Sequence, residues 1–308
     1  MKLTILVIGA CGQLGSELTR ALRKKHGWKN VIAADIHPAT DTSQRDGLYL
    51  QLDVLNKKKL AYIVAHRGIK HIYHLAAVLS ATAEQNPARA WEINMQGLLN
   101  VLEVAKDHKV QQLFWPSSIA VFDKHCDIKP STVYGISKAA GENWCQYYFE
   151  RYGLDVRSLR YPGLISHRTK PGGGTTDYAV DIFHQAIQRG GYECFLNKET
   201  TLPMMYMPDA VNATLALMDA PPANIHIRSA YNIAAMSFSP VELADEIGGH
   251  LPGFEMNYCP DFRQAIADNW PKHIDDQNAR RDWGWQETYN LETMTADMLA
   301  HLNQKELC

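Results

Sequence analysis

Tyr134 and Lys138 have side chains and a spacing that could move a proton. Residues four positions apart lie on the same face of a helix, so this phenol and this ammonium could reach one cofactor and one substrate together. A free tyrosine has a pKa of about 10, and a neighbouring cation can lower the pKa of an acid by roughly one to three units. The pair therefore indicates a tyrosine that accepts a proton from an alcohol. The same spacing also arises by chance on many helices.

Three glycines near the start of the chain could bind a phosphate group. Gly9, Gly12 and Gly15 follow an apolar run at 3–8 and form the pattern G-x-x-G-x-x-G, before a helix that we expect to begin near Gln13. The backbone N–H groups of such a turn can approach a pyrophosphate, and the N-terminus of the helix adds partial positive charge. A tight turn without a ligand is the alternative interpretation of the glycines alone.

An acidic residue at the end of the next predicted strand supports nucleotide binding. The apolar residues 31–35 end in Asp35, which follows Gly15 by about 20 residues. Dinucleotide sites place a carboxylate at this distance to accept hydrogen bonds from the ribose hydroxyls. A carboxylate would repel a 2′-phosphate, and no lysine or arginine follows before Arg45. The sequence therefore predicts NAD, and not NADP, as the cofactor.

Apolar strands alternate with helical stretches through the first half of the chain. We expect further strands at 48–53, 71–75, 112–116 and 155–161, with helices at 57–66, 88–106 and 134–152. This alternation implies crossover connections and a parallel sheet that is covered by helices on both faces. Open sheets of this kind keep their chemistry at the carboxyl ends of the strands, where Ser117 and Ser118 follow a predicted strand.

The composition gives no sign of nucleic-acid or membrane partners. The 308 residues include 31 lysines and arginines against 33 aspartates and glutamates. The apolar run at 3–8 is too short to cross a bilayer and opens the glycine turn, so we expect no signal peptide and a cytoplasmic protein. Six scattered cysteines without a C-x-x-C pair predict neither a disulfide scaffold nor a zinc knuckle. His71 and His74 have no third ligand at a suitable spacing, and we expect no metal site.

Four features in this order resemble the short-chain dehydrogenase/reductase superfamily: the glycine turn, the acidic end of the second strand, Ser118, and Tyr134-x-x-x-Lys138. SSIAVF at 117–122 and DQNARRDWGW at 276–285 look like its extended, epimerase-like branch. The resemblance covers essentially the full chain. It implies that Ser118, Tyr134 and Lys138 form the active site, and that two copies form a dimer through the helices at 88–106 and 134–152.

The same resemblance implies an α/β fold, a doubly wound (Rossmann), mostly parallel seven-stranded sheet with a smaller C-terminal lobe. We expect residues 1–165, together with about 205–236, to form a dinucleotide-binding domain. Residues 166–204 and 237–308 are expected to form the substrate-binding lobe.

The segments around the expected substrate site indicate which enzymes of this superfamily the chain resembles. Nucleotide-sugar epimerases of this branch usually carry an asparagine that holds the phosphates of the substrate, at a place where this chain has Pro162 and Gly163. RYPGLIS at 160–166, PGGGTTDYAVDIF at 171–183 and WPSSIAVF at 115–122 instead resemble the NAD-dependent L-threonine 3-dehydrogenases. The glycines and threonines of the second segment could offer N–H and hydroxyl groups to a small carboxylate, although a mobile surface loop would have a similar composition. The resemblance implies oxidation of the 3-hydroxyl of L-threonine to 2-amino-3-oxobutyrate, with hydride transfer to NAD+.

Two other functions stay open at this stage. A nucleotide-sugar 4-epimerase or dehydratase would share the cofactor half, and an NAD sensor without catalysis would tolerate the loss of Tyr134 or Lys138. Under the main interpretation Tyr134 takes the hydroxyl proton, Ser118 positions the same oxygen, and Lys138 lowers the tyrosine pKa. The expected cofactor contacts are Gly9, Gly12, Gln13, Leu14, Gly15, Asp35, Asp53, Val54, Leu75, Ala76, Ala77, Asn94, Tyr134, Lys138, Tyr161, Pro162, Leu164 and Ile165. The expected substrate contacts are Ser80, Ser118, Tyr134, Gly174, Thr175 and Thr176.

Overall fold

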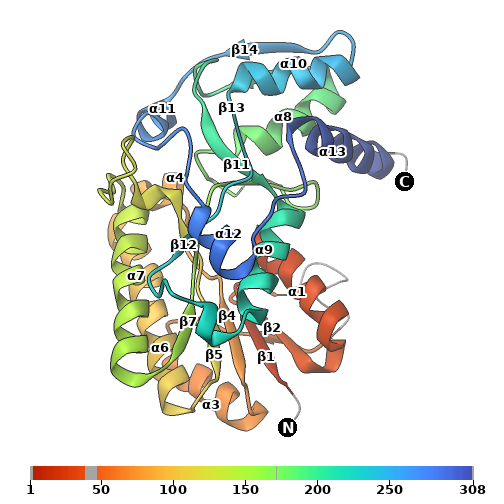
Figure 1. Ribbon diagram of the computed structural model, residues 1–308. Coiled ribbons are helices and arrows are strands. Elements are labelled where there is room, and N and C mark those ends of the chain that lie inside the picture. The colour runs from red at the N-terminus through yellow and green to blue at the C-terminus, as the bar shows by residue number, and fades with distance from the viewer. Residues whose placement is uncertain (1–2, 39–46, 171, 307–308) are drawn as a thin grey trace.

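The computed structural model describes residues 3–38, 47–170 and 172–306, and its central element is a parallel sheet (Figure 1). Within these residues six strands pair in the order β3-β2-β1-β4-β5-β7. Their bounds are β1 Ile5–Ile8, β2 Val31–Asp35, β3 Tyr49–Gln51, β4 His71–His74, β5 Gln112–Phe114 and β7 Asp155–Arg157. The order reverses between β1 and β4, so the carboxyl ends of these two strands flank the crevice where open α/β sheets bind ligands.

The strands place alternate side chains on opposite faces of the sheet. In β1, Ile5 and Val7 belong to the apolar cluster on one face of the sheet, whereas Leu6 and Ile8 belong to the cluster on the opposite face. A strand that is buried on both faces needs such a continuous apolar run. The helices are α1 Gln13–His26, α3 Lys57–Arg67, α6 Gly97–Asp107, α7 Val133–Tyr152 and α9 Met207–Asp219. The expected doubly wound α/β fold is confirmed.

In the part of the chain that the structure describes, the main sheet has six strands and not seven, because the strands predicted at 112–116 and 155–161 are each interrupted. Pro116 has no N–H to donate, so the pairing of β5 with β7 stops there. Pairing resumes between β6 (Ser117–Ser118) and β8 (Leu159–Tyr161), and β12 (Tyr231–Asn232) pairs with β8 in the same separate three-stranded sheet. The break leaves Ser117 and Ser118 just beyond the carboxyl edge of the main sheet.

The predicted helix at 88–106 is also interrupted. It consists of α5 (Pro87–Trp91), a π-helical turn (Glu92–Gln96) and α6. Asn94 lies in the wide turn, where its Nδ2 donates to the Val78 carbonyl at 3.1 Å and its Oδ1 accepts from the Val78 N–H at 2.8 Å. The same Nδ2 lies 3.2 Å from Ser137 Oγ on α7. Asn94 therefore joins α7 to the segment that follows β4.

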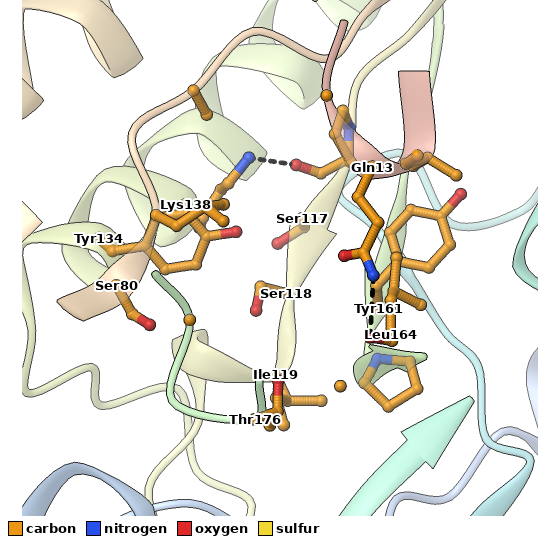
Figure 2. Close-up of a pocket in the computed structure, with 18 of the residues that line it drawn as sticks. Gln13, Ser80, Ser117, Ser118, Ile119, Tyr134, Lys138, Tyr161, Leu164 and Thr176 are labelled. Carbon is orange, nitrogen blue, oxygen red and sulfur yellow. Dashed lines mark hydrogen bonds between the residues drawn. The ribbon is translucent and has the colours of Figure 1, made fainter. Parts of the chain in front are cut away.

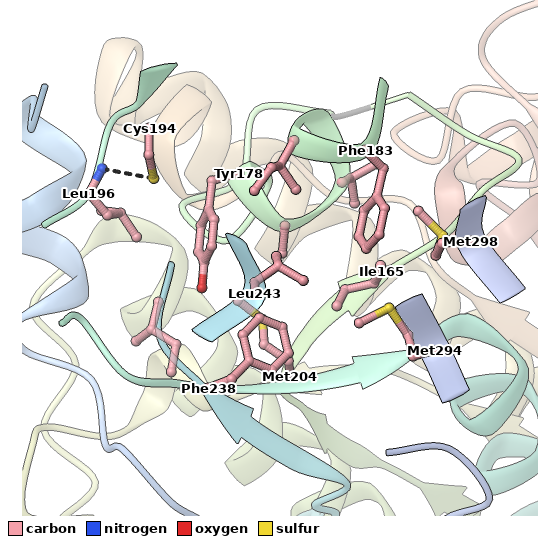
Figure 3. Packing of buried hydrophobic residues seen from close by; sticks show 14 of the residues in the cluster. Ile165, Tyr178, Phe183, Cys194, Leu196, Met204, Phe238, Leu243, Met294 and Met298 are labelled. Atoms are coloured by element: carbon pink, nitrogen blue, oxygen red, sulfur yellow. Dashed lines mark hydrogen bonds between the residues drawn. The ribbon is translucent and has the colours of Figure 1, made fainter. Parts of the chain in front are cut away.

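A smaller lobe lies over the carboxyl edge of the sheet (Figure 1). Its helices are α8 Tyr178–Arg189, α10 Pro240–His250, α11 Phe262–Ala267 and α13 Leu291–Glu306, and its strands are β9 Gly163–Ile165, β10 Gly191–Cys194, β11 Leu202–Tyr206, β13 Met236–Phe238 and β14 Glu255–Tyr258. Figure 3 shows its apolar core, in which Tyr178 and Phe183 of α8 lie near Leu243 of α10 and Met294 of α13. Two shorter helices are α4 (Ser80–Gln85) and α12 (Gln277–Trp283).

A segment near the C-terminus, α12 and Trp285, packs against the nucleotide-binding half of the protein. Ala279 of α12 and Trp285 are buried in the cluster that also holds the inner faces of α1 and α9. Asp282 accepts a hydrogen bond from the Tyr231 hydroxyl at 2.8 Å. Every helix that the structure describes is too short or too polar to cross a bilayer.

Candidate active site

A cavity of about 240 Å³ opens between the glycine turn, the start of α7 and the small lobe (Figure 2). Most of the expected site residues line it: Gly9, Gly12, Gln13, Leu14, Gly15, Leu75, Ala77, Ser80, Ser118, Tyr134, Lys138, Tyr161, Pro162, Leu164, Gly174, Thr175 and Thr176. Six expected cofactor contacts do not line it: Asp35, Asp53, Val54, Ala76, Asn94 and Ile165. Further residues that were not expected at the site also line the cavity: Leu79, Pro116, Ser117, Ile119, Gly163, Asp177 and Trp270.

The glycine turn is packed so tightly that side chains are excluded. A Cβ atom on Gly9 would lie 2.5 Å from the Ala76 backbone nitrogen, and one on Gly15 would lie 2.0 Å from the Gly9 carbonyl oxygen. Gly9 also has a φ of 83°, which side chains disfavour. Gly12 is the N-cap of α1, and no side chain caps the helix there. The helix N-terminus therefore faces the cavity with backbone N–H groups, as an anion site requires.

Asp35 holds this turn from the end of β2. Its buried carboxylate accepts the Cys11 N–H at 2.9 Å and the His37 N–H at 3.1 Å. Each carboxylate oxygen has two lone pairs, so Asp35 can still accept hydrogen bonds from ribose hydroxyls. Asp53 instead accepts the Leu55 N–H at 2.9 Å, in the local turn that leads to α3. Val54 packs against Gly97, where an added Cβ would lie 2.8 Å from its Cγ1 atom.

Ser118, Tyr134 and Lys138 lie together on one side of the cavity (Figure 2). The helix α7 begins one residue before Tyr134, and the Thr132 side chain caps it by accepting the Gly135 N–H at 3.0 Å. Lys138 Nζ donates to the Pro116 carbonyl at 2.5 Å and lies 4.4 Å from the centre of the Trp115 ring. The same Nζ is 5.4 Å from the centre of the Tyr134 ring.

Burial controls the acidity of the two proton-active groups. It raises the pKa of Tyr134 to about 12, while the hydrogen bond with Ser118 acts in the opposite direction. It lowers the pKa of Lys138 to about 7, against the effect of Cys145 and Glu142. Burial and Ser118 are the causes that act on the pKa of Tyr134 here, so the lowering of this pKa by Lys138 stays a prediction. The ammonium is directed at Pro116 and Trp115, so Ser118 is the group that favours the phenolate.

A buried ion pair between Glu142 and Arg160 binds Ser117, and it was not predicted from the sequence. Ser117 Oγ donates to Glu142 Oε1 at 2.5 Å. Arg160 binds the same carboxylate with two N–H groups, at 2.8 Å and 2.7 Å. Glu142 is one helical turn after Lys138 on α7, so the spacing i, i+4 that revealed Lys138 also points to Glu142.

The glycine loop differs from our expectation. The Oδ2 atom of Asp177 accepts the N–H groups of Gly172, Gly173 and Gly174 at 2.9, 2.8 and 2.7 Å. These amides were expected to hold the carboxylate of a substrate, but a side chain of the loop itself already binds them. Gly174, Thr175 and Thr176 still line the cavity, and the Thr175 hydroxyl lies 3.3 Å from that of Ser80.

Residues 5–234 match the model of the NAD dependent epimerase/dehydratase family. The chain belongs to this family. A relative from Bos taurus, named L-threonine 3-dehydrogenase, mitochondrial, is 45% identical over 305 residues, which are 96% of this chain and 81% of the relative. A solved structure described as a GalE-like L-threonine dehydrogenase from Cupriavidus necator, in its holo form, is 51% identical with a TM-score of 0.95, covering 97% of this chain and 99% of that chain. Another solved structure is described as a monomeric L-threonine 3-dehydrogenase from a metagenome database, in its apo form. It is 45% identical with a TM-score of 0.94, and the match covers 98% of this chain and 99% of that chain.

As a member of the NAD dependent epimerase/dehydratase family, the protein uses NAD. The cavity fits this cofactor, because Gly9, Gly12 and Gly15 line it without side chains and the tight packing of Gly9 and Gly15 fixes the turn. The uncapped N-terminus of α1 suits the pyrophosphate, and Asp35 suits an adenosine ribose without a 2′-phosphate.

Proposed function

We propose that this protein is an L-threonine 3-dehydrogenase, which oxidises the 3-hydroxyl group of L-threonine to 2-amino-3-oxobutyrate. One observation carries the choice of substrate. A Cβ atom on Gly163 would lie 2.3 Å from Met204 Sδ and 2.7 Å from Thr176 Cβ. A phosphate-binding asparagine at position 163 would crowd Met204 and Thr176, so the packing of this turn disfavours the side chain that a nucleotide-sugar enzyme uses. The names of the relatives at 45% to 51% identity support the same choice.

Three side chains of the cavity carry out the reaction in this proposal. Tyr134 accepts the proton of the substrate hydroxyl, and Ser118 hydrogen-bonds the same oxygen and favours the phenolate. NAD+, when bound, accepts the hydride from C3, so the alcohol loses one proton and one hydride and becomes a ketone. Lys138 has a pKa of about 7, so it can exchange a proton near neutral pH, and its cation, near the start of α7, can interact with the ribose of the cofactor.

Ser80, Thr175 and Thr176 are proposed to hold the amino and carboxylate groups of L-threonine. A hydroxyl can donate to a carboxylate and accept from an ammonium, so all three suit a zwitterion. Asp177 serves this site indirectly, because its carboxylate fixes the backbone just before both threonines.

The decisive experiment follows NADH absorbance with L-threonine, D-threonine, L-serine and UDP-glucose, each with NAD+. L-Threonine should give the highest kcat/KM, and UDP-glucose should give neither NADH nor UDP-galactose. Turnover of UDP-glucose without turnover of L-threonine would replace this proposal with a nucleotide-sugar 4-epimerase. Binding of NAD+ without turnover of any substrate would favour an NAD sensor.

We also propose a homodimer that works in threonine catabolism in the cytoplasm. We propose the domain division given above with two exceptions: α12 and Trp285 pack on the nucleotide-binding half, and β9 pairs with β11 of the small lobe. Large apolar side chains are exposed along α5 and α7, namely Trp91, Ile136, Trp144, Tyr147 and Tyr152. An exposed apolar patch of this kind favours association. One similar chain is described as monomeric, so the test is the molar mass of this protein measured by light scattering at several concentrations. A constant monomer mass would refute the dimer.

A further inference from the structure

Asp177 is the one acidic residue among the described residues that line the active-site cavity. It is the N-cap residue of α8 and directly follows Thr175 and Thr176 in the chain. L-Threonine, the substrate proposed above, carries an ammonium group next to its carboxylate. Burying an ammonium is costly unless an acceptor, preferably a negatively charged one, pairs with it. The cavity therefore contains a single residue of the charge that this part of the substrate needs.

The two carboxylate oxygens of Asp177 have different partners. Oδ2 accepts the N–H groups of Gly172, Gly173 and Gly174, at 2.9, 2.8 and 2.7 Å. Within the described parts of the chain, Oδ1 accepts no hydrogen bond, and the side chain does not cap α8. A carboxylate oxygen has two lone pairs, so Oδ1 can accept hydrogen bonds from a ligand. The loop thus holds one oxygen in place and leaves the other available.

The glycine at position 174 leaves the space beside Oδ1 free of a side chain. A Cβ atom on Gly174 would lie 2.9 Å from Asp177 Oδ1, and Gly174 itself lines the cavity. Its φ is outside the left-handed region that favours glycine, so the backbone conformation does not require a glycine here. Figure 2 shows Thr176, next to Asp177 in the chain, around the same space as Ser118 and Tyr134. The absence of a side chain at position 174 keeps Oδ1 accessible.

The negative charge of Asp177 is not compensated by a cation of its own. Burial raises the pKa of its carboxyl group, whereas the three glycine N–H groups and the more remote Arg263 lower it. Arg263 is already paired with Asp261, with its Nη2 2.6 Å from the Asp261 Oδ2 atom. A cation that binds beside Oδ1 would therefore offset part of the cost of burying this carboxylate.

We propose that Asp177 Oδ1 binds the ammonium group of the substrate and so selects 2-amino-3-hydroxy acids over 3-hydroxy acids without an amino group. This inference rests on the proposed threonine reaction. The hydroxyls of Ser80, Thr175 and Thr176 then serve the carboxylate of the substrate. The amino group is on C2, one bond from the reacting C3, so the contact also orients the carbon that loses the hydride. Asp177 thereby orders the glycine loop through Oδ2 and determines specificity through Oδ1.

The test compares L-threonine with (R)-3-hydroxybutyrate, which has the same configuration at the reacting carbon but no amino group. In Asp177→Asn one amide oxygen can still accept the three glycine N–H groups, whereas the NH2 group that replaces Oδ1 can only donate. The ratio of kcat/KM for L-threonine to kcat/KM for (R)-3-hydroxybutyrate should therefore fall at least about 100-fold, because the substrate ammonium loses its charged partner. The matched control is Asp181→Asn, since Asp181 lies one turn later on α8 and does not line the cavity. This control should keep the wild-type ratio.

Binding of NADH, followed by fluorescence, shows whether each variant is folded. If Asp177→Asn does not bind NADH like wild type, Gly174→Ala decides, because its methyl group would crowd Oδ1 while the charge remains. In that variant the ratio should fall at least about tenfold, as expected for a weakened hydrogen bond to a charged group. An unchanged ratio in the deciding variant, whether both kcat/KM values fall together or neither changes, would overturn the ammonium contact and leave Asp177 as a residue that only orders the loop. A wild-type protein that does not oxidise L-threonine would instead refute the proposed reaction, and this contact with it, so the two failures are distinguishable.

Discussion

Lys138 should destabilise the folded protein at neutral pH, so a variant without its charge should be more stable and inactive. The side chain is buried at the start of α7, and burial lowers the pKa of its ammonium from 10.5 to about 7. The hydrogen bond to the Pro116 carbonyl at 2.5 Å and the Trp115 ring at 4.4 Å compensate only part of the lost hydration. In the unfolded chain the same ammonium is hydrated and keeps its ordinary pKa.

The direction of the pH effect follows from these two pKa values. The folded pKa lies below the unfolded one, so between pH 7 and 10.5 the unfolded chain binds more protons and stability rises with pH. Below pH 7 both states are protonated, and the penalty on the folded state is complete, about 4 to 5 kcal/mol for this shift. Between pH 7 and pH 9 about 2 kcal/mol of this penalty should disappear.

Lys138→Met fills the same space without a charge. At pH 7 the free energy of unfolding of this variant should exceed that of wild type by roughly 2 to 4 kcal/mol. The variant should not show the increase in stability between pH 7 and pH 9 that we expect for wild type. Urea unfolding of wild type, Lys138→Met and the control Lys198→Met, whose lysine is exposed, measures both effects at each pH. The same change in stability from pH 7 to pH 9 in all three proteins would refute the reasoning, because Lys138 could then not be desolvated.

The remaining predictions concern turnover and cofactor choice. Tyr134→Phe should lower kcat by roughly 10² to 10⁴ with nearly unchanged NADH binding by fluorescence, and near-normal turnover would remove Tyr134 as the base. Wild type should have a much higher kcat/KM with NAD than with NADP. Asp35→Ala combined with Ile36→Arg should bring the two kcat/KM values closer together. Equal wild-type turnover with both cofactors would contradict this role of Asp35. Thr176→Ala should raise KM for L-threonine with little change in the Kd for NAD, whereas unchanged kinetics after replacing both Thr175 and Thr176 would exclude the loop from substrate binding.

Sequence reasoning worked where a short segment determines its own geometry. Gly9 and Gly15 are required because backbone atoms lie where their Cβ atoms would be, and their spacing is set by a single turn. Tyr134 and Lys138 face one cavity because helix geometry alone aligns residues four apart. The break at Pro116 could also have been predicted from its missing N–H, but the apolar run before it favoured a longer strand.

Contacts between distant segments could not be predicted in this way. Glu142 and Arg160 are ordinary charged residues in the sequence, and only the packing of α7 on β8 makes them a buried pair behind Ser117. Asp53 follows β3, and one of its oxygens accepts the Leu55 N–H, so its expected contact with the cofactor stays a prediction. Nothing in the spacing of a chain distinguishes a carboxylate that faces a ligand from one that closes its own turn.

Asp177 is the clearest case of this ambiguity, and it bears on the choice of substrate. Its carboxylate binds the three glycine amides, so the carboxylate of a substrate must find donors among hydroxyl groups. Among the described residues that line the cavity, Lys138 and Asp177 are the charged ones, one of each sign. The pyrophosphate of NAD is expected at the N–H groups of the glycine turn, so the diphosphate of a nucleotide sugar would bring two further negative charges to a cavity whose one cation, Lys138, burial already keeps near its pKa. A zwitterion brings no net charge and needs only the donors and acceptors that hydroxyls supply. The charge of the cavity therefore favours a free amino acid over a nucleotide sugar, independently of the steric argument at Gly163.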